Sequence, residues 1–306
     1  KHAPFYPPAM SAPAFIEAET FLFHQGYYNA AASNTTTRPV LSPVVEILLQ
    51  QRSGSISPAL AAQRIDSLSR FDIRNDSKQY LLRPAVHSQQ AIAWQGGSSF
   101  ISGYIGLGFD NDLSSAVGNS YRRYTLTVKN TVKLHPRIRL GSFITYTQSL
   151  AASNNPGSLS PGGGRSSLYP YARLVDEQNR WLPVPKDYRM AYIDTAGGGR
   201  LLNWHYRPLE ELHLADNNTR LQDMLIGFTG RITLASFLNT EISYQYGKQS
   251  SANHNHAAAE TYFARNLINR FTQLSGNTIK YILPPGGILT SSQAALTTQN
   301  LRAQLN

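Results

Sequence analysis

The stretch that decides the fold runs from Phe100 to Leu150 and reads FISGYIGLGFDNDLSSAVGNSYRRYTLTVKNTVKLHPRIRLGSFITYTQSL. Apolar side chains alternate with polar or small ones along it, beginning with Ile101, Ile105 and Leu107 on one face of an extended run. Alternation over about ten residues exceeds the usual strand length of about five or six residues in soluble proteins. A tilted strand needs about 9–11 residues to cross a bilayer. The pattern therefore predicts a piece of a transmembrane β-barrel.

The same alternation recurs before and after this stretch. It predicts strands over 86–95, 100–110, about 121–132, 137–148, 220–231 and 241–247, which form pairs joined by short turns such as GGSS at 96–99. In each strand one face is apolar and the other carries small or polar side chains, as in a barrel with a polar lumen. The residues that we expect to face lipid are Ile101, Ile105, Leu107, Phe109, Leu126, Val128, Ile144, Met224, Ile226, Phe228, Ile242 and Tyr244.

The connections between these pairs are long, which is the asymmetry of an outer-membrane barrel. We expect a single partial barrel domain over 1–306, all-β and antiparallel in class, because about six strands are too few to close a barrel alone. Its expected parts are an extracellular loop over 1–85, four strands over 86–148, a loop over 151–218, two strands over 219–247, a loop over 248–299 and the start of a strand over 300–306.

The loops contain short predicted helices and many aromatic residues. Helices are expected to end near Gly26, to cover 43–51 and to cover 57–69, and a fourth lies within AETYFARNLINRFTQ at 259–273. The aromatic residues of the second loop are candidates to face a ligand or a lid, since such rings stack on sugars or pack at interfaces. The alternative is that they only pack the loop against itself. These residues are Tyr169, Tyr171, Trp181, Trp204 and Tyr206.

Composition agrees with a barrel and excludes several other classes. Charged residues make up 15% of the 306 residues, against roughly 25% in soluble domains. The net charge is +10, but the arginines are scattered without a basic helix, so no nucleic-acid partner is expected. The absence of cysteine excludes disulfides and thiolate metal sites. Because the chain begins with a lysine, we expect either a processed protein or an internal piece of a longer one.

No catalytic or metal site is expected from the sequence. The HxH pair His254 and His256 lies in a stretch that reads as a solvated loop and has no third ligand before Glu260. The adjacent acids at 176–177 and 210–211 do not by themselves form the separated pair that glycoside hydrolysis requires. There is no GxSxG motif for a serine nucleophile. We therefore predict neither an enzyme nor a cofactor.

Several segments together resemble the SusC family of TonB-dependent outer-membrane transporters. They are PFYPPAMSAPAFIEAETFLFHQGYY at 4–28, the strand–GGS–strand passage at 90–109, YPYARLVDEQNRWLPVP at 169–185, LLNWHYRPLEEL at 201–212 and ARNLINRFTQ at 264–273. The resemblance extends over nearly the whole chain. The sequence departs from the family pattern at Asn203, where an acid is more common, and it contains neither the plug domain nor the TonB box.

The resemblance implies a barrel of about 22 strands in the bacterial outer membrane, filled by a plug. It implies import of oligosaccharide or peptide ligands, a SusD-like surface lipoprotein as lid, and energy from TonB through parts that this sequence does not contain. The loops would face the cell exterior. The alternative interpretation is a secreted or surface-anchored β-rich module that binds glycans without transporting them.

Overall fold

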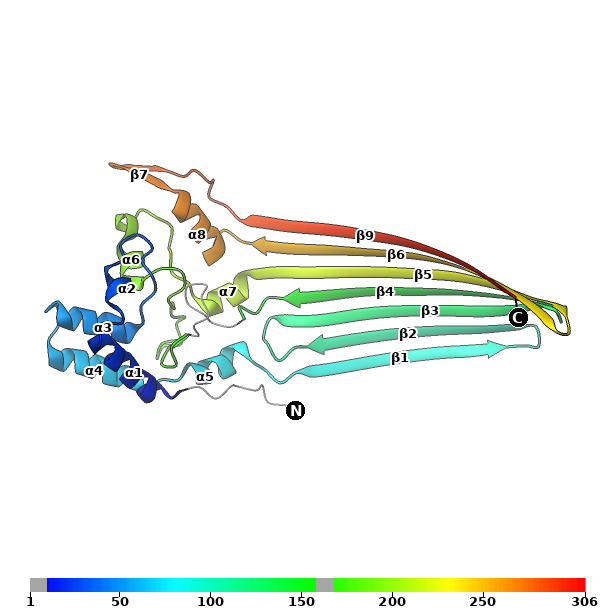
Figure 1. Ribbon diagram of the computed structural model, residues 1–306, viewed down its shortest axis with the longest axis horizontal. Helices are drawn as coiled ribbons and strands as arrows, with labels where there is room; N and C mark the ends of the chain where they lie inside the picture. Colours follow the sequence, from blue (N-terminus) through cyan, green and yellow to red (C-terminus); the bar gives the residue numbers. More distant parts are fainter. Residues whose placement is uncertain (1–9, 158–167, 306) are drawn as a thin grey trace. The chain divides into compact units, whose positions relative to one another are not determined.

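A computed structural model describes residues 10–157 and 168–305 (Figure 1). The predicted loops over 1–85 and 151–218 therefore lie partly outside the described residues. The chain divides into two compact units. One consists of residues 85–153, 216–255 and 289–306 and is a β-sheet. The other consists of residues 1–84, 154–215 and 256–288 and contains the helices.

The first unit is a seven-stranded sheet with the order β1-β2-β3-β4-β5-β6-β9. Strands β1 to β5 pair antiparallel with their neighbours in chain order. In Figure 1 these strands lie side by side, with short turns joining β1 to β2, β3 to β4 and β5 to β6 at one end of the sheet. The strands are β1 Val86–Gly97, β2 Ile101–Leu113, β3 Asn119–His135, β4 Ile138–Ser153, β5 Ala215–Ala235, β6 Leu238–Ala257 and β9 Ile288–Leu305.

The structure contains each of the six strands predicted from the sequence, but makes them longer. β5 and β6 have 21 and 20 residues, so residues 248–257, which were predicted as loop, belong to β6. The prediction that a last strand starts at residue 300 is also wrong, because β9 begins at Ile288. The connection between the strands predicted over 100–110 and about 121–132 is correspondingly shorter and covers residues 114–118. In each case the strand continues into polar residues, where backbone pairing persists without apolar alternation.

The second unit contains the short helices, and the three predicted in the first loop are all present. Ser57 accepts a hydrogen bond from the backbone N–H of Leu60, so it caps the third of these helices as its sequence position predicts. The elements are α1 Ala12–His24, α2 Asn29–Ser33, α3 Pro43–Arg52, α4 Pro58–Ser69, α5 Ile73–Asp76, η1 Ser77–Leu81, α6 Met190–Thr195, η3 Ala196–Gly199, α7 Pro208–Leu214, α8 Tyr262–Phe271 and a hairpin of β7 Gln273–Ser275 with β8 Thr278–Lys280.

The core of this unit is built from segments far apart in the sequence. Val44 and Val45 of α3 are fully buried and belong to one hydrophobic cluster with Leu174 and Trp204 from the second loop. Arg189 fastens the two parts, because its guanidinium donates to the Glu46 carboxylate from both Nε and Nη2, at 2.5 and 2.7 Å. The first helices and the second loop therefore share one core.

Glu19 of α1 lies inside this core. Only 6% of the residue is exposed, and its Oε2 accepts a hydrogen bond of 2.5 Å from the hydroxyl of Tyr171. Burial raises the pKa of the Glu19 carboxyl above its ordinary value, although the hydrogen bonds from Tyr171 and Ser42 lower it. The negative charge of Glu19 in turn adds to the effect of burial in raising the pKa of Tyr28 to about 12.

Glu19→Gln is expected to stabilise the helical unit at neutral pH. The raised folded-state pKa means that the folded protein holds the Glu19 proton more tightly than the unfolded chain. Stability from this group is therefore greatest in acid and falls as pH rises above the ordinary value of 4.5. The measurement is the thermal midpoint at pH 4 and pH 7.5 for both proteins. A variant that loses stability at pH 7.5 would contradict this account.

Candidate functional site

The strand register places the predicted lipid-facing residues of β2 to β5 on one face of the sheet. Ile105 lies opposite Val128, Val128 opposite Ile144, and Ile144 opposite Ile226, so one apolar row crosses four strands. Directly opposed residues share a face. Ile92 and Trp94 of β1 lie on the same face of the sheet, since they pair with Leu107 and Ile105 respectively. We call this surface the apolar face.

Large side chains on the apolar face are exposed to a degree that soluble proteins avoid. Ile92 is 71% exposed, Trp94 65% and Phe228 56%. Ile242 and Tyr244 of β6 are exposed too. They alternate with Glu241, which bonds Arg231 on the opposite face, so they belong to the apolar face. A contiguous apolar surface across so many strands marks a contact with a membrane or another protein.

The opposite surface, the polar face, has three parallel rows of residues near the short turns. The register defines each row, because opposed residues on neighbouring strands lie about 4.7–4.9 Å apart. The large-residue row consists of Gln95, Tyr104, Lys129 and Phe143. The small-residue row consists of Gly97, Ser102, Thr131, Gly141 and Thr229. The cationic row consists of Lys133, Arg139 and Arg231.

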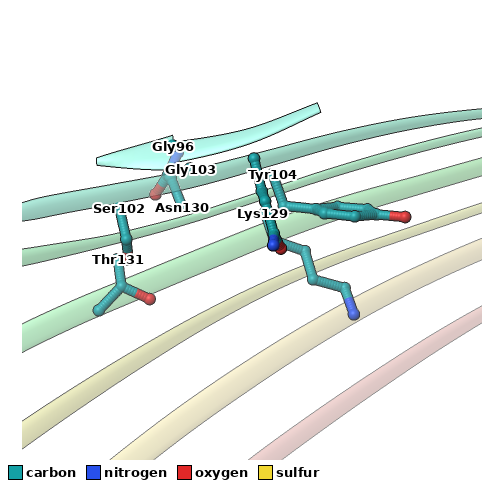
Figure 2. A pocket seen from close by; sticks show the side chains of 8 residues that line it. Gly96, Ser102, Gly103, Tyr104, Lys129, Asn130 and Thr131 are labelled. Atoms are coloured by element: carbon teal, nitrogen blue, oxygen red, sulfur yellow. The ribbon is translucent and has the colours of Figure 1, made fainter. Parts of the chain in front are cut away.

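The small-residue row forms the floor of a trough between the other two rows. At its β1–β3 end there is a hollow of about 480 Å³ lined by Gln95, Gly96, Ser102, Gly103, Tyr104, Lys129, Asn130 and Thr131. Figure 2 shows this hollow, with the long side chains of Tyr104 and Lys129 next to one another and the short side chains of Ser102 and Thr131 beside them. Hydroxyl groups on the floor both donate and accept hydrogen bonds.

Two aromatic rings of the large-residue row lie over glycines of the polar face. A Cβ atom on Gly227 would be 2.1 Å from the ring of Phe143, and one on Gly106 would be 2.6 Å from the hydroxyl of Tyr104. Gly227 is opposite Phe143 in the register. A ring that covers a glycine fixes register and bends the sheet locally. The sequence analysis predicted neither contact.

Gly227→Ala is expected to destabilise the sheet by about 1–3 kcal/mol, because the added methyl group occupies the space of the Phe143 ring. The double variant Gly227→Ala with Phe143→Ala should recover part of this loss, since the smaller side chain leaves room. The measurement is the urea midpoint of strand unfolding in detergent. Gly286→Ala serves as the control, because nothing lies within 4 Å of a Cβ there. Equal effects of both single variants would contradict the packing.

Most of the aromatic residues predicted to face a ligand are core residues of the helical unit. Tyr169, Tyr171, Trp204 and Tyr206 are each less than 10% exposed. Tyr169 and Tyr171 stack with ring centroids 4.6 Å apart, and Trp204 donates from its indole N–H to Asn266. In this structure these four rings are not accessible to a ligand, because they fill the shared core. Trp181 differs: it is 41% exposed and stacks on His213.

The acidic pairs considered for hydrolysis are held by arginines. Arg265 of α8 is buried and donates to the backbone carbonyls of Asn203 and His205, while its Nη2 lies 3.7 Å from Glu210 and 3.9 Å from Glu211. Burial raises the pKa of the Glu211 carboxyl. These contacts join the second and third loops, so the carboxylates have a structural role.

Asp176, from the other acidic pair, closes a turn. Its Oδ1 accepts backbone N–H bonds from Gln178 and Arg180, and its Oδ2 binds the Arg180 side chain. The backbone N–H of Arg180 is the main cause that lowers the pKa of Asp176. A carboxylate that is ionised and already bonded in this way is a poor general acid.

His254 and His256 lie in β6, where the sequence predicted a loop. They therefore share a face of a strand, and His254 lies 3.9 Å from Asp216. Within residues 10–157 and 168–305 no group of three His, Asp or Glu side chains is placed to hold a metal ion. Across the same residues, the helices are all too short or too polar to span a membrane.

Comparisons with known proteins show similarity to solved structures but no match to a protein-family model or a curated protein. A structure of the RagAB peptide importer in the open-open state is 13% identical, with a TM-score of 0.53 over 75% of this chain and 23% of that chain. The RagAB peptide transporter matches at 13% identity and a TM-score of 0.51 over 74% and 22%.

The importer in its closed-closed state is 12% identical, with a TM-score of 0.52 over 88% of this chain and 30% of that one. This chain thus spans between 22% and 30% of the length of these solved chains. At such identities the likeness concerns the fold alone.

Proposed function

We propose that this chain is part of a SusC-like, TonB-dependent transporter of the bacterial outer membrane. The observation that carries the proposal is the pair of unlike faces on one long sheet. The apolar face exposes large side chains across β1 to β6, while the polar face carries hydroxyl, amide and charged groups. A sheet with these faces suits a barrel wall between lipid and a polar lumen.

In this proposal further strands pair with the free edges of β1 and β9 and close a barrel of about 22 strands around a plug. The sheet end with the short turns faces the periplasm. The segments 1–85, 151–218 and the helical part of 248–299 stand outside the cell as loops, and Trp181 is the predicted aromatic residue that remains available there. TonB acts through parts of the protein that this sequence does not contain.

We infer a peptide cargo in preference to an oligosaccharide, together with a SusD-like surface lipoprotein as lid. The support is the shared fold with the RagAB peptide importer. The chain itself contributes a wall and loops, so binding and gating belong to the assembled protein. Movement of a lid over the loops would be a hinge-type closure. In this account nothing in the wall performs covalent chemistry.

The test is the mass and location of the intact source polypeptide. An outer-membrane fraction is solubilised in detergent, boiled, and probed with an antibody against this chain. A band several times heavier than 33.9 kDa in that fraction is the expected result. A band at 33.9 kDa that stays soluble without detergent would overturn the proposal and favour a secreted glycan-binding module, whose binding to glycan arrays would then be measured.

A further inference from the structure

The trough on the polar face carries positive charge that its own sheet does not neutralise. Lys133 lies directly opposite Arg139, and Arg139 directly opposite Arg231. Like charges in directly opposed positions destabilise a sheet. Arg231 has a partner in Glu241. Among the described residues, no carboxylate lies within ion-pair distance of Lys129, Lys133 or Arg139.

The other end of the polar face is different. There Arg123 lies opposite Asp110 and bonds its carboxylate at 2.8 Å, and His87 lies 3.1 Å from Asp112. Cations on this face are therefore paired with acids away from the trough, whereas, among the residues that the structure describes, Lys133 and Arg139 beside it are not. An anionic partner bound beside these cations would relieve their mutual repulsion.

The dimensions of the trough suit an extended chain. Its floor crosses five strands, from Gly97 of β1 to Thr229 of β5. At a strand spacing of about 4.8 Å the floor is roughly 19 Å long, which accommodates about six residues of extended polypeptide. Glycines and hydroxyl side chains keep the floor low, while the large-residue row borders it on one side and the cationic row on the other.

We propose that the trough binds an extended acidic segment of polypeptide, with its carboxylates toward Lys133 and Arg139. The hydroxyls of Ser102, Thr131 and Thr229 would bond its backbone, which presents donors and acceptors in turn. A polypeptide is favoured over an anionic glycan because the inference rests on the proposed function, in which peptide is the cargo. Lys129 adds a further cation in the large-residue row (Figure 2).

The test measures binding of a fluorescein-labelled peptide of alternating Glu and Ser to the full chain in detergent, by fluorescence anisotropy. The same peptide with Gln in place of Glu, and a sulfated dextran oligosaccharide, are the comparison probes. The acidic peptide is expected to bind, and to bind more weakly as salt rises. Binding of the Gln peptide with equal affinity, or of the dextran alone, would overturn the proposal.

Variants then locate the binding. Arg139→Gln should weaken binding roughly tenfold, as expected when one charge-assisted contact is lost. Thr131→Trp should abolish it without any change in charge, because the indole fills the floor. Arg220→Gln removes a charge from the same sheet on the apolar face, where Arg220 lies opposite Leu150, and should leave binding unchanged.

A measurement of thermal stability distinguishes a variant that has lost a binding contact from one that has lost its fold. Removing Arg139 relieves its repulsion from Lys133 and Arg231. The thermal midpoint of Arg139→Gln should therefore equal or exceed that of the wild type while binding falls. Wild-type affinity in Arg139→Gln would contradict the inference. If the chain resides in the outer membrane yet binds no acidic peptide, the trough inference fails while the proposed function stands. A soluble 33.9 kDa protein would instead remove the proposed function.

Discussion

Ile105→Arg is expected to prevent assembly of the protein into the outer membrane. Ile105 lies in the middle of β2, between Trp94 and Val128 of the neighbouring strands, on the apolar face. An arginine at the bilayer midplane on the lipid face of a barrel costs about 2–4 kcal/mol. Phe228→Arg on β5 should behave in the same way, because Phe228 is exposed on the same face. The measurement is the amount of each variant in the outer-membrane fraction.

The matched control is Thr147→Arg. Thr147 lies on the polar face of β4, opposite Thr125 and Asp223, so the added charge meets an acid in a polar surrounding. This variant should assemble at the wild-type level. If Ile105→Arg and Phe228→Arg assemble as well as Thr147→Arg, the assignment of the two faces is wrong.

Arg265→Met is expected to destabilise the helical unit by about 3–5 kcal/mol. Removal of one partner from a buried ion pair leaves the other charge uncompensated. Here Glu211 loses the cation 3.9 Å from it, Glu210 keeps only Arg207 at 3.7 Å, and the carbonyls of Asn203 and His205 lose their donor. Among the described residues, Glu210 Oε2 is a buried atom without a hydrogen bond, so its charge depends on such nearby cations. The measurement is the urea midpoint of helix unfolding.

Arg270→Met is the control for this change, because Arg270 lies on the same helix with its side chain exposed. It should cost less than about 0.5 kcal/mol, as is usual for surface positions. Adding Glu211→Gln to Arg265→Met should restore part of the stability, since one of the buried charges disappears. Equal losses for Arg265→Met and Arg270→Met would show that the buried ion pairs contribute little.

The sequence predicted the faces of the strands well and their ends badly. Alternation of apolar and polar residues follows directly from the two-residue period of a strand, so it located β1 to β6 and sorted their side chains between two faces. This alternation disappears where a strand extends beyond the part of the sheet that has an apolar face. Residues 248–257 and 288–299 are rich in Ser, Thr, Asn and Gln, which read as loop although the backbone continues to pair.

The trough was not predicted, because it depends on register between distant strands. Lys133 and Arg139 flank a short turn, and that spacing could have shown them to be opposed. Arg231 and Gly227 belong to β5, which follows a long connection, and no local pattern fixes its register. The burial of Tyr171 and Trp204 was not predicted for the same reason, because the core that covers them includes helices from the start of the chain.

The claim that this sheet crosses a bilayer is tested most directly by scanning β4 with single cysteines. The chain has no cysteine of its own, so one nitroxide label at a time can be placed at each position from 140 to 147. Collision with oxygen, which concentrates in lipid, and with a water-soluble nickel complex is then measured in membranes. We predict oxygen maxima at the even positions, including Ile144, and none at the odd positions. Equal nickel access at even and odd positions would contradict the account.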